Sequence, residues 1–568
     1  MQNPLVRSLA NLPRIFTSDY WAGAGMGTVL GDPGLYRPLT IFTYALNYAV
    51  SGLSPVAFHA TNVALHAATA VMVLLLAVEL LGPTVAAFAA GAIFAVHPIH
   101  AEAVTGVVGR AEILTAFFAL LSLRVGRGTS IPAAAGSGVF YLLALFSKES
   151  AAMLPALFLL YDWTRRGSSD RGARTPLKAL APRYISLAIA LAVYAAFRFN
   201  AVKLPAHSWD GWLGVPAYAR VLTASRVLAE YLLLFIWPRT LLADYAAGDV
   251  PVARSPDVAV LLSVALWIAL IVAFTTKLRR HRVLLFSFAW FFLAILPASN
   301  LLFAAGLGKA ERILYFPSVG LCLATGWMIK WLYDRAPARQ TALAVAFSAV
   351  LLALAMRTWR RNEDWRNDLA LARASLAISP ASALMNSVAG TELLKLDSTR
   401  EATPFLERAV REAPAKPFYH VRLGSAYYSA QQSERAAAEF QRALQLSPRD
   451  PDALSDLGAI YIDRHDLNQA LTLLNAALSA SPRHAGAHMN RGLVYLEAGR
   501  IADAIQDFRA AIDIDPSRAD GHNNLGVAFG RSGRVVEAAA EFREALRLRP
   551  DYASARANLN AVLNPPPR

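Results

Sequence analysis

Residues 56–81 read VAFHATNVALHAATAVMVLLLAVELL, an apolar run without a proline or a glycine. About 20 apolar residues are enough for a helix to cross the hydrocarbon core of a bilayer. A segment inside lipid must satisfy its backbone polar groups internally, which a helix does. This stretch therefore predicts a transmembrane helix and places the first part of the chain in a membrane.

Further apolar segments surround this helix. They lie at 84–97, 111–124, 131–146, 150–163, 183–200, 257–275, 283–297, 312–332 and 341–356. Several are shorter than a full crossing, so we expect some broken helices. We predict a multi-pass transmembrane domain of about ten helices over residues 56–356. The single cysteine, Cys322, excludes an intramolecular disulfide and a cysteine-based zinc site.

Residues 357–568 are polar, rich in alanine and periodic. Prolines recur every 34 residues at 380, 414, 448, 482, 516 and 550, and glycines keep the same period at 390, 424, 458, 492 and 526. This period is typical of tetratricopeptide repeats (TPRs), in which small residues let paired helices approach closely. We predict an all-α chain with a linker and half repeat at 357–382, five repeats at 383–550, and a capping helix and tail at 551–568.

Repeat arrays of this kind bind partner proteins or extended peptides on a concave face. His488 and His522 occupy one repeat position. They either line that groove or are solvated residues of the first helix of each pair.

The net charge of +15 is concentrated in short loops between apolar segments, which is a topology signal and does not favour nucleic acid. The loop after residue 163 and the stretch 277–282 carry the strongest basic signals and are predicted to be cytoplasmic. Residues 1–55 then form an extracytoplasmic first loop with a juxtamembrane helix. The apolar segment 219–237 is predicted to lie at the outer interface, because it contains two arginines and a glutamate. If it spans instead, everything after it changes sides.

Charged and polar residues gather at segment ends that fall on the predicted outer side. Such residues are functional candidates, because a charge near a bilayer is costly. The candidates for binding a donor phosphate are Arg37, His97, His100, Arg110, Lys148, Glu149, Asp244, Glu311, Arg312 and Tyr315. The candidate catalytic acids are Asp19, Glu102 and Glu112. Two histidines near a glutamate could also bind a metal, but the proline between them argues against one helical face, so no metal is expected.

Four stretches carry a family resemblance. They are YRPLTIFTYALNYAVSGLSPVAFHATNVALHA (36–67), FAVHPIHAEAVTGVVGRAEIL (94–114), FSKES (146–150) with LPALFLLYDW (154–163), and ASNLLFAAGLGKAERILYFPSVG (298–320). Followed by the repeats, they closely resemble the transmembrane-and-TPR O-mannosyltransferase family and its bacterial relatives.

That family is similar to GT-C glycosyltransferases. The resemblance implies a GT-C-like membrane domain that transfers a mannose-like sugar from a polyprenyl-phosphate donor to Ser or Thr of a protein, with the repeats engaging the acceptor or a partner. It also implies a multi-pass protein of the cell (inner) membrane with extracytoplasmic, periplasmic repeats. Relatives have an acidic pair shortly before an Asn-Pro-like segment; here Asn3-Pro4 stands at the start of the sequence. We therefore expect a first helix and its acid upstream of Met1, with Asp19 as the early substitute.

Two other functions fit the same sequence. One is a non-catalytic, membrane-anchored TPR scaffold for envelope complexes. The other is a transporter or ligase of lipid-linked saccharides. In all three cases the membrane lipid is a partner and nucleic acid is not.

Overall fold

The computed structural model describes residues 3–22, 34–165, 177–202, 214–246, 249–302 and 308–564. Within these ranges all regular structure is helical and no strand forms, which confirms the predicted all-α class. The chain divides into two compact units, Met1–Pro380 and Ala381–Arg568. The division falls inside the segment 357–382 that we predicted to be a linker and half repeat.

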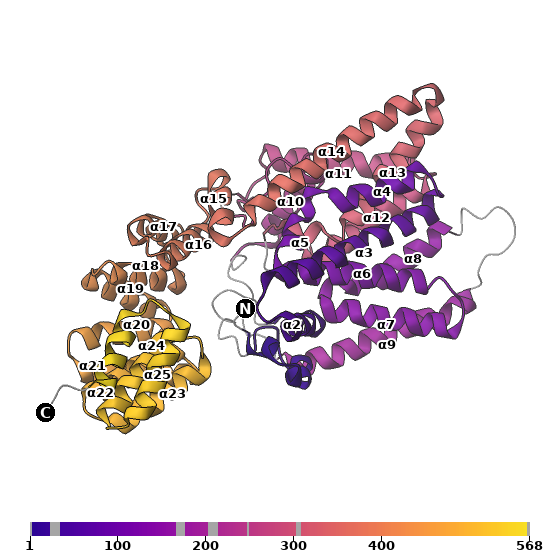
Figure 1. The fold of residues 1–568 in the computed structure, drawn as a ribbon. Helices are drawn as coiled ribbons and strands as arrows, with labels where there is room; N and C mark the ends of the chain where they lie inside the picture. The colour runs from indigo at the N-terminus through magenta and orange to yellow at the C-terminus, as the bar shows by residue number, and fades with distance from the viewer. Residues whose placement is uncertain are drawn as a thin grey trace. The chain divides into compact units, whose positions relative to one another are not determined.

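The first unit is a bundle of long helices that run side by side (Figure 1). Each of the ten apolar segments predicted from the sequence is helical there. Its helices are α1 (Leu12–Thr17), α2 (Pro38–Ser51), α3 (Pro55–Leu81), α4 (Val85–Val96), α5 (Ala101–Thr105), α6 (Arg110–Val125), α7 (Ile131–Ser147), α8 (Leu154–Arg165), α9 (Leu177–Ala201), α10 (Ala217–Ile236), α11 (Val258–Thr276), α12 (Arg282–Ile295), α13 (Ser318–Arg335), α14 (Gln340–Asp364) and α15 (Asp368–Ile378). Short 3₁₀ turns join several of them, of which η3 (Pro98–His100), η4 (Val107–Gly109), η5 (Glu149–Met153) and η8 (Glu311–Leu314) matter for the site.

Four of the described helices are long and apolar enough to cross a membrane: α3, α9, α11 and the stretch Pro337–Asp364 that contains α14. A fifth candidate is α4 together with Pro98–Thr105, which are bent by 44° at the break. Two more apolar helices, α7 and Arg282–Ala298, are shorter. The remaining predicted segments are helices that do not meet these limits: α6 and α8 are short, with 16 and 12 residues, and the C-terminal part of α13 carries Lys330, Asp334 and Arg335.

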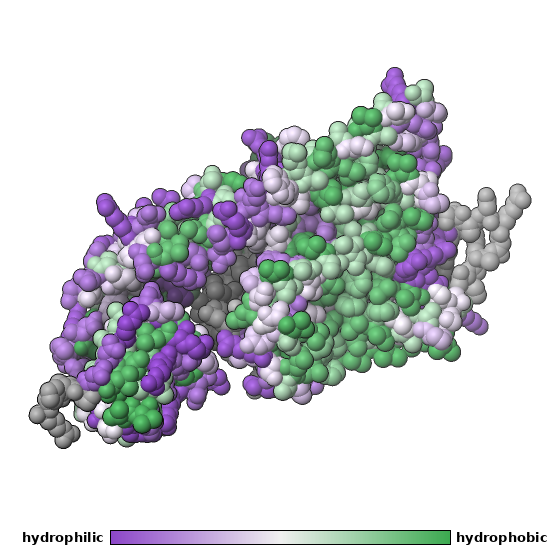
Figure 2. Space-filling model, viewed as in Figure 1, coloured by the Kyte–Doolittle hydropathy of each residue, from purple (hydrophilic) through white to green (hydrophobic). Residues whose placement is uncertain are grey.

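Apolar side chains cover the outside of this bundle as well as its core. On α11, Leu262 and Ile271 are more than half exposed. Figure 2 shows a broad hydrophobic surface over the long helices of the first unit. A surface of this size and character is suited to lipid.

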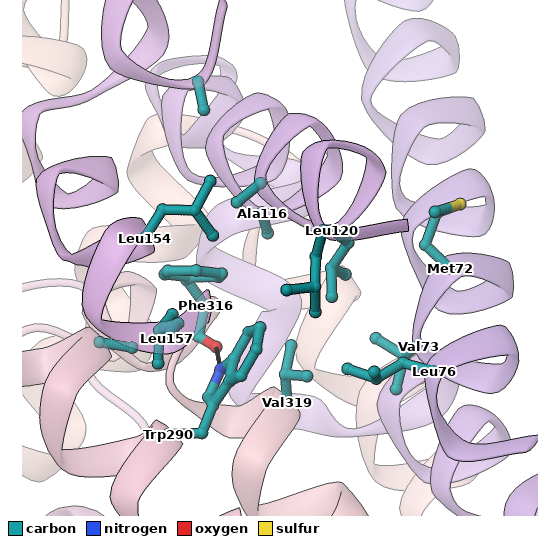
Figure 3. Packing of buried hydrophobic residues seen from close by; sticks show 14 of the residues in the cluster. Met72, Val73, Leu76, Ala116, Leu120, Leu154, Leu157, Trp290, Phe316 and Val319 are labelled. Carbon is teal, nitrogen blue, oxygen red and sulfur yellow. Dashed lines mark hydrogen bonds between the residues drawn. The ribbon is translucent and has the colours of Figure 1, made fainter. Parts of the chain in front are cut away.

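The bundle core is closely packed. Figure 3 shows Trp290 of α12 among Leu154, Leu157, Phe316 and Val319. The Trp290 side chain is fully buried, and its indole Nε1 donates to the Phe316 carbonyl at 3.1 Å. This bond satisfies the one polar group that the indole brings into the core.

The second unit consists of helix pairs followed by a final single helix. The pairs are α16 (Ala383–Lys395) with α17 (Thr399–Glu412), α18 (Pro417–Ser429) with α19 (Ser433–Leu446), α20 (Pro451–Asp463) with α21 (Leu467–Ala480), α22 (Ala485–Glu497) with α23 (Ile501–Ile514), and α24 (Ala519–Arg531) with α25 (Val535–Leu548). The final helix is α26 (Ala553–Leu563). The periodic glycines explain the close pairing: a Cβ on Gly492 would lie 2.5 Å from Phe508 Cε1.

Successive first helices of these pairs contact one another, whereas contacts between successive second helices are few or absent. The first helices therefore line the inner side of the array. Polar side chains link them across repeats: Ser425 donates to Asp456 at 3.2 Å, and Asn558 donates to Asn523 at 3.0 Å. These first helices form the surface on which we expect a partner to bind.

Candidate functional site

The site is built around the break between α4 and α5. His97 follows α4 directly, Pro98 begins the 3₁₀ turn η3, and α5 starts after His100. His97 supports this break: its Nε2 donates to the Phe235 carbonyl at 2.8 Å, and its Nδ1 accepts from the Ile99 amide at 3.3 Å. The His97 ring also stacks on the Phe235 ring with centroids 4.7 Å apart.

His100 is buried and tied to its surroundings in the same way. Its Nδ1 donates to the Phe94 carbonyl at 2.8 Å, and its Nε2 lies 2.9 Å from the Ser318 hydroxyl. Tyr315 is also buried, and its hydroxyl lies 2.7 Å from His66 Nδ1. His97 thus ties the broken helix to α10, His100 ties it to Ser318 of α13, and Tyr315 bonds to α3. The predicted role of these three side chains in phosphate binding stays a prediction.

The metal alternative finds no donor set in the part of the chain that the structure describes. No three His, Cys, Asp or Glu side chains gather there in an arrangement that could hold a metal ion. The rings of His97 and His100 have their centroids 6.2 Å apart, and each ring is committed to a backbone carbonyl.

Arg110 is the first residue of α6 and is fully buried. Its Nε donates to Asn62 at 2.7 Å, and its Nη1 donates to Asn47 at 2.6 Å. Its Nη2 donates to the Phe58 carbonyl at 3.0 Å, and the guanidinium lies over the Tyr44 ring. The residue therefore joins α2, α3 and α6, and the structure gives it neutral partners in place of a carboxylate.

Three ion pairs bring the four sequence motifs together at one end of the bundle. Arg37 at the start of α2 pairs with Glu149 of η5, Lys148 pairs with Glu112 of α6, and Arg312 of η8 pairs with Glu102 of α5. We call these residues the charge layer: Arg37, Glu102, Glu112, Lys148, Glu149 and Arg312. The sequence predicted these charged residues on one side of the membrane, and the contacts show that they are also neighbours in space.

The pairs of the charge layer differ in geometry. Arg37 contacts Glu149 with two nitrogens, at 3.2 Å from Nε and 2.8 Å from Nη2. The Glu102 carboxylate accepts a hydrogen bond from the Arg312 backbone amide at 2.7 Å, and it also contacts the Arg312 guanidinium. Glu112 acts electrostatically on both Arg37 and Arg312, so the three pairs form one connected group.

Exposure is uneven within the charge layer. The side chains of Glu102 and Glu112 are 4% and 5% exposed, whereas those of Arg312 and Glu149 are 32% and 38% exposed. Burial acts to raise the pKa of Glu149, but the Arg37 guanidinium outweighs it and lowers the pKa to about 2. The accessible edge of the layer therefore presents a cation, Arg312, and a carboxylate that stays ionised.

Glu311, beside Arg312, is fully buried. Its Oε1 accepts hydrogen bonds from the Tyr245 hydroxyl at 3.0 Å and from the Leu242 amide. Asp244 lies in the same short segment, between these two partners. This segment and η8 are thus held together by Glu311, and the predicted role of Glu311 and Asp244 in donor binding stays a prediction.

Asp19 lies apart from these ion pairs. Its side chain accepts a hydrogen bond from the Trp21 amide at 2.8 Å and thereby closes a turn. The adjacent Tyr20 ring lies 6.0 Å from the Arg37 guanidinium, so the turn borders the charge layer. The predicted catalytic roles of Asp19, Glu102 and Glu112 remain predictions.

The sequence interpretation missed two contributors. Glu230 of α10 pairs with Lys309 at 2.8 Å and lies 3.5 Å from Arg226, which links Lys309, just before η8, to α10. Arg361 of α14 faces Glu311 with Nη2 3.9 Å from Oε2. Both signals were visible as charges beside apolar segments, but only the fold shows which motif they face.

A second polar group lies at the other end of the same helices. Glu79 near the end of α3 pairs with Arg127 at 2.9 Å and with Arg165 at 3.0 Å. At this end Arg282 donates to the Trp163 carbonyl at 3.1 Å. The bundle therefore has two distinct polar ends, and the charge layer lies at only one of them.

In the second unit, three histidines form the same contact in their repeats. The Nδ1 of each bonds to an acidic residue 19 positions later, and the Nε2 of each bonds to the carbonyl of a periodic proline. The residues are His420 with Glu439 and Pro414, His488 with Asp507 and Pro482, and His522 with Glu541 and Pro516. These rings hold neighbouring helices together instead of projecting freely into a groove or into solvent.

Family models for tetratricopeptide repeats match residues 424–463, 455–519 and 515–553. A thermophilic TPR protein of Thermus thermophilus, TTC0263, is 24% identical in a solved structure, with 32% of this chain and 99% of that chain covered and a TM-score of 0.30. The fold and the repeats together define a helical protein with membrane-crossing helices and a C-terminal TPR array.

Curated relatives identify the kind of protein further. Protein O-mannosyl-transferase TMTC1 of Homo sapiens is 30% identical over 443 residues, which cover 67% of this chain and 48% of that protein. Protein O-mannosyl-transferase TMTC3 of Mus musculus is 30% identical over 436 residues, which cover 71% and 47%. The chain thus spans about half the length of these relatives, and its predicted resemblance to the transmembrane-and-TPR O-mannosyltransferase family is confirmed.

Proposed function

We propose that this chain is a membrane glycosyltransferase that moves a mannose-like sugar from a polyprenyl-phosphate donor to a Ser or Thr hydroxyl of a protein. The charge layer is the observation that carries the proposal. Four motifs that are distant in sequence combine there to place three cations in one group of ion pairs. The names of the relatives supply the reaction class.

The cations suit a phosphate on a lipid. Arginine and lysine bind phosphate through charge-assisted hydrogen bonds. Arg312 is the accessible cation of the layer, and its partner Glu102 is buried behind it. Arg37 and Lys148 are nearly buried, with side chains 13% and 12% exposed, and they add positive potential behind the accessible edge.

In the proposed reaction the acceptor hydroxyl oxygen attacks the anomeric carbon of the sugar. The bond between that carbon and the phosphate oxygen breaks, and the lipid phosphate leaves with the bonding electrons. The hydroxyl proton passes to a carboxylate that acts as general base. Negative charge grows on the leaving phosphate, so Arg312 and its neighbours stabilise the transition state more than the ground state.

The carboxylates divide into two proposed roles. Glu102, Glu112 and Glu149 each hold one cation, which orients the donor-binding side chains. Asp19, in its turn beside the layer, is the early carboxylate outside these ion pairs that we propose as base. The layer has equal numbers of cations and carboxylates, so an incoming phosphate must compete for Arg312 with Glu102.

The second unit is proposed to bind the acceptor protein or a partner on the inner surface of its first helices. Asn490, Asn524 and Asn558 recur there every 34 residues, on α22, α24 and α26. Amide side chains both donate and accept, which suits an extended peptide backbone. We also propose that the charge layer and the repeats lie on the extracytoplasmic side of the membrane.

The test uses the full chain in nanodiscs with a polyprenyl-phosphate mannose donor and a Ser/Thr-rich acceptor protein. Transfer of labelled sugar to the acceptor, and its loss in Arg312→Ala and Lys148→Ala, is the expected result. A folded wild-type chain that binds the acceptor but transfers no sugar would overturn the enzyme proposal and support the scaffold. Release of the sugar to another lipid-linked saccharide would support the ligase.

A further inference from the structure

The last turns of α14 touch the loops that carry the charge layer. Thr358 Oγ1 donates to the Val96 carbonyl at 2.6 Å, immediately before His97. Arg357 Nη2 donates to the Arg239 carbonyl at 2.9 Å. A Cβ on Gly106 would lie 3.5 Å from the Trp365 ring, so this indole packs against the end of α5. The segment 357–365 therefore braces the candidate site from one side.

Arg361 lies at the centre of this brace. Its side chain is only 3% exposed. Its Nη1 bonds to Asp364 at 3.1 Å, but among the described residues neither Nε nor Nη2 has a hydrogen-bond partner. The Nη2 faces Glu311 Oε2 at 3.9 Å, and that oxygen is likewise without a hydrogen bond. Buried polar atoms of this kind need a physical explanation, since burial without a partner costs free energy.

Charge supplies that explanation. A fully buried carboxylate is costly unless an opposite charge lies close to it. Glu311 is such a carboxylate, and Glu102 adds a second negative charge on the neighbouring element. Arg361 is the cation that faces its free oxygen. The arginine and the carboxylate therefore stabilise one another at a place where neither is solvated.

We propose that Arg361 is a positioning residue: it holds the buried Glu311 side chain, and through Glu311 it fixes the backbone that presents Arg312 to the donor. Glu311 ties η8 to the segment 242–245 through Leu242 and Tyr245. Arg312 follows it directly and commits its own amide to Glu102. This inference deepens the proposed function, because Arg312 is the proposed phosphate ligand.

The charge state of Glu311 then sets a pH limit. The groups that act on it are Arg361 of α14, Glu102 of α5, Tyr231 of α10 and Tyr245. Around these, Asp364 pairs with Arg361, Lys309 lies over the Tyr245 ring, and Arg312 follows Glu311 in sequence. Burial raises the pKa of Glu311, Arg361 opposes this rise, and Glu102 adds to it. Removal of Arg361 therefore moves the pKa of Glu311 further up, and the ionised form is lost at a higher pH.

The first readout does not need sugar transfer. Infrared titration of the full chain in nanodiscs follows the carbonyl band of a protonated carboxyl, and Glu311→Gln assigns that band. We expect the midpoint of the Glu311 band to rise by at least about one pH unit in Arg361→Gln, and by less in Arg361→Lys, which keeps the charge. Arg335→Gln, at the far end of α13 from Ser318, is the matched control and leaves the midpoint unchanged.

The second readout is the pH dependence of transfer. In Arg361→Gln the acidic limb of kcat/KM moves to higher pH. The KM for the donor rises about tenfold at a pH just above the wild-type midpoint, where Glu311 is ionised in wild type and protonated in the variant, because a displaced binding group loses its geometry. In the double variant Arg361→Gln/Glu311→Gln the limb that Glu311 causes is absent. Equal midpoints in wild type and Arg361→Gln overturn the inference. If Arg361→Gln does not fold, equal midpoints in wild type and Arg361→Lys overturn it. A chain without transfer activity overturns the proposed function and leaves the infrared result to stand alone.

Discussion

The two units of the chain both bury ionisable side chains, but they arrange them differently. In the charge layer of the first unit each pair occurs once and joins segments that are apart in sequence: Arg312 lies 210 residues from Glu102. In the second unit one kind of pair recurs, and His488 lies 19 residues from Asp507. A unique long-range pair defines a particular place in the fold, whereas a repeated short-range pair supports each repeat that contains it in the same way. The difference indicates where chemistry is expected and where the array only needs stability.

The strongest test of this difference is to remove one cation from each unit. We expect Arg312→Ala to lower kcat/KM for transfer about 10³-fold, which corresponds to about 4 kcal/mol, because the leaving phosphate loses its accessible cation. Arg491→Ala removes a cation of the second unit that pairs with Asp507 at 2.7 Å, and we expect transfer within about twofold of wild type. Initial rates at matched protein levels decide this. An equal loss in both variants would mean that the charge layer is not special.

A second experiment sharpens the comparison inside the first unit, where not every buried charge belongs to the charge layer. Arg110→Ala leaves Asn62 and Asn47 without their donor in the core, and we expect a loss of about 3 kcal/mol in the free energy of unfolding. The exposed Arg124, on the same helix α6, is the control, and Arg124→Ala changes stability by about 0.5 kcal/mol or less. Thermal unfolding in detergent measures both. Equal midpoints for the two variants would contradict the structural role of Arg110.

The sequence predicted the second unit more completely than the first. Its 34-residue period repeats along the array, so spacing alone locates helix ends and close contacts. The charge layer was predicted as a group, because alternating segments bring alternate loops to one side of a membrane. The partners within it were not predicted, since loop order does not say whether Lys148 meets Glu112 or Glu149. A pairing of this kind is a property of tertiary packing.

Other residues escaped prediction for reasons that are equally physical. Arg361 follows the last apolar segment and resembles an ordinary surface arginine until α14 carries it into the interior. Arg226 made the segment 219–237 ambiguous, and the structure bonds its Nη2 to the Pro251 carbonyl at 2.5 Å. The role of His488 depended on an acid 19 residues away, on the second helix of the same pair. This separation is not one at which two residues face each other on a single helix. Contacts between residues on different helices are difficult to predict from sequence spacing.

A third experiment tests whether repeated packing explains the second unit. Gly492→Ala adds a Cβ 2.5 Å from Phe508, and we expect a loss of about 2 kcal/mol in unfolding free energy. Gly530→Ala is the matched control in the next repeat, because its Cβ meets atoms only at 3.9 Å or more. That substitution is expected to be neutral or to stabilise by about 0.5 kcal/mol, since alanine favours helix. Urea unfolding of residues 381–568 gives both values. A stabilised Gly492→Ala variant would show that the Phe508 ring moves aside without loss of unfolding free energy.

The smallest expected effect is the pH dependence of the second unit. The hydrogen bond to Glu439 raises the pKa of His420, and burial together with Asp452 raises the pKa of Asp456 to about 6. A raised folded pKa means that the stabilising contribution is complete below the unfolded pKa and is lost as the pH rises through the folded pKa. Both groups therefore make residues 381–568 less stable at about pH 8 than at about pH 5.5. The fall in Tm between these values is expected to be smaller in His420→Gln/Asp456→Asn than in wild type. A wild-type Tm that rises with pH would show that other groups control the array.

Glu149 of the charge layer behaves oppositely: Arg37 lowers its pKa, so its contribution to stability is lost only as the pH falls towards about 2. An acidic shift across this range thus favours the repeats and leaves the Arg37–Glu149 pair intact.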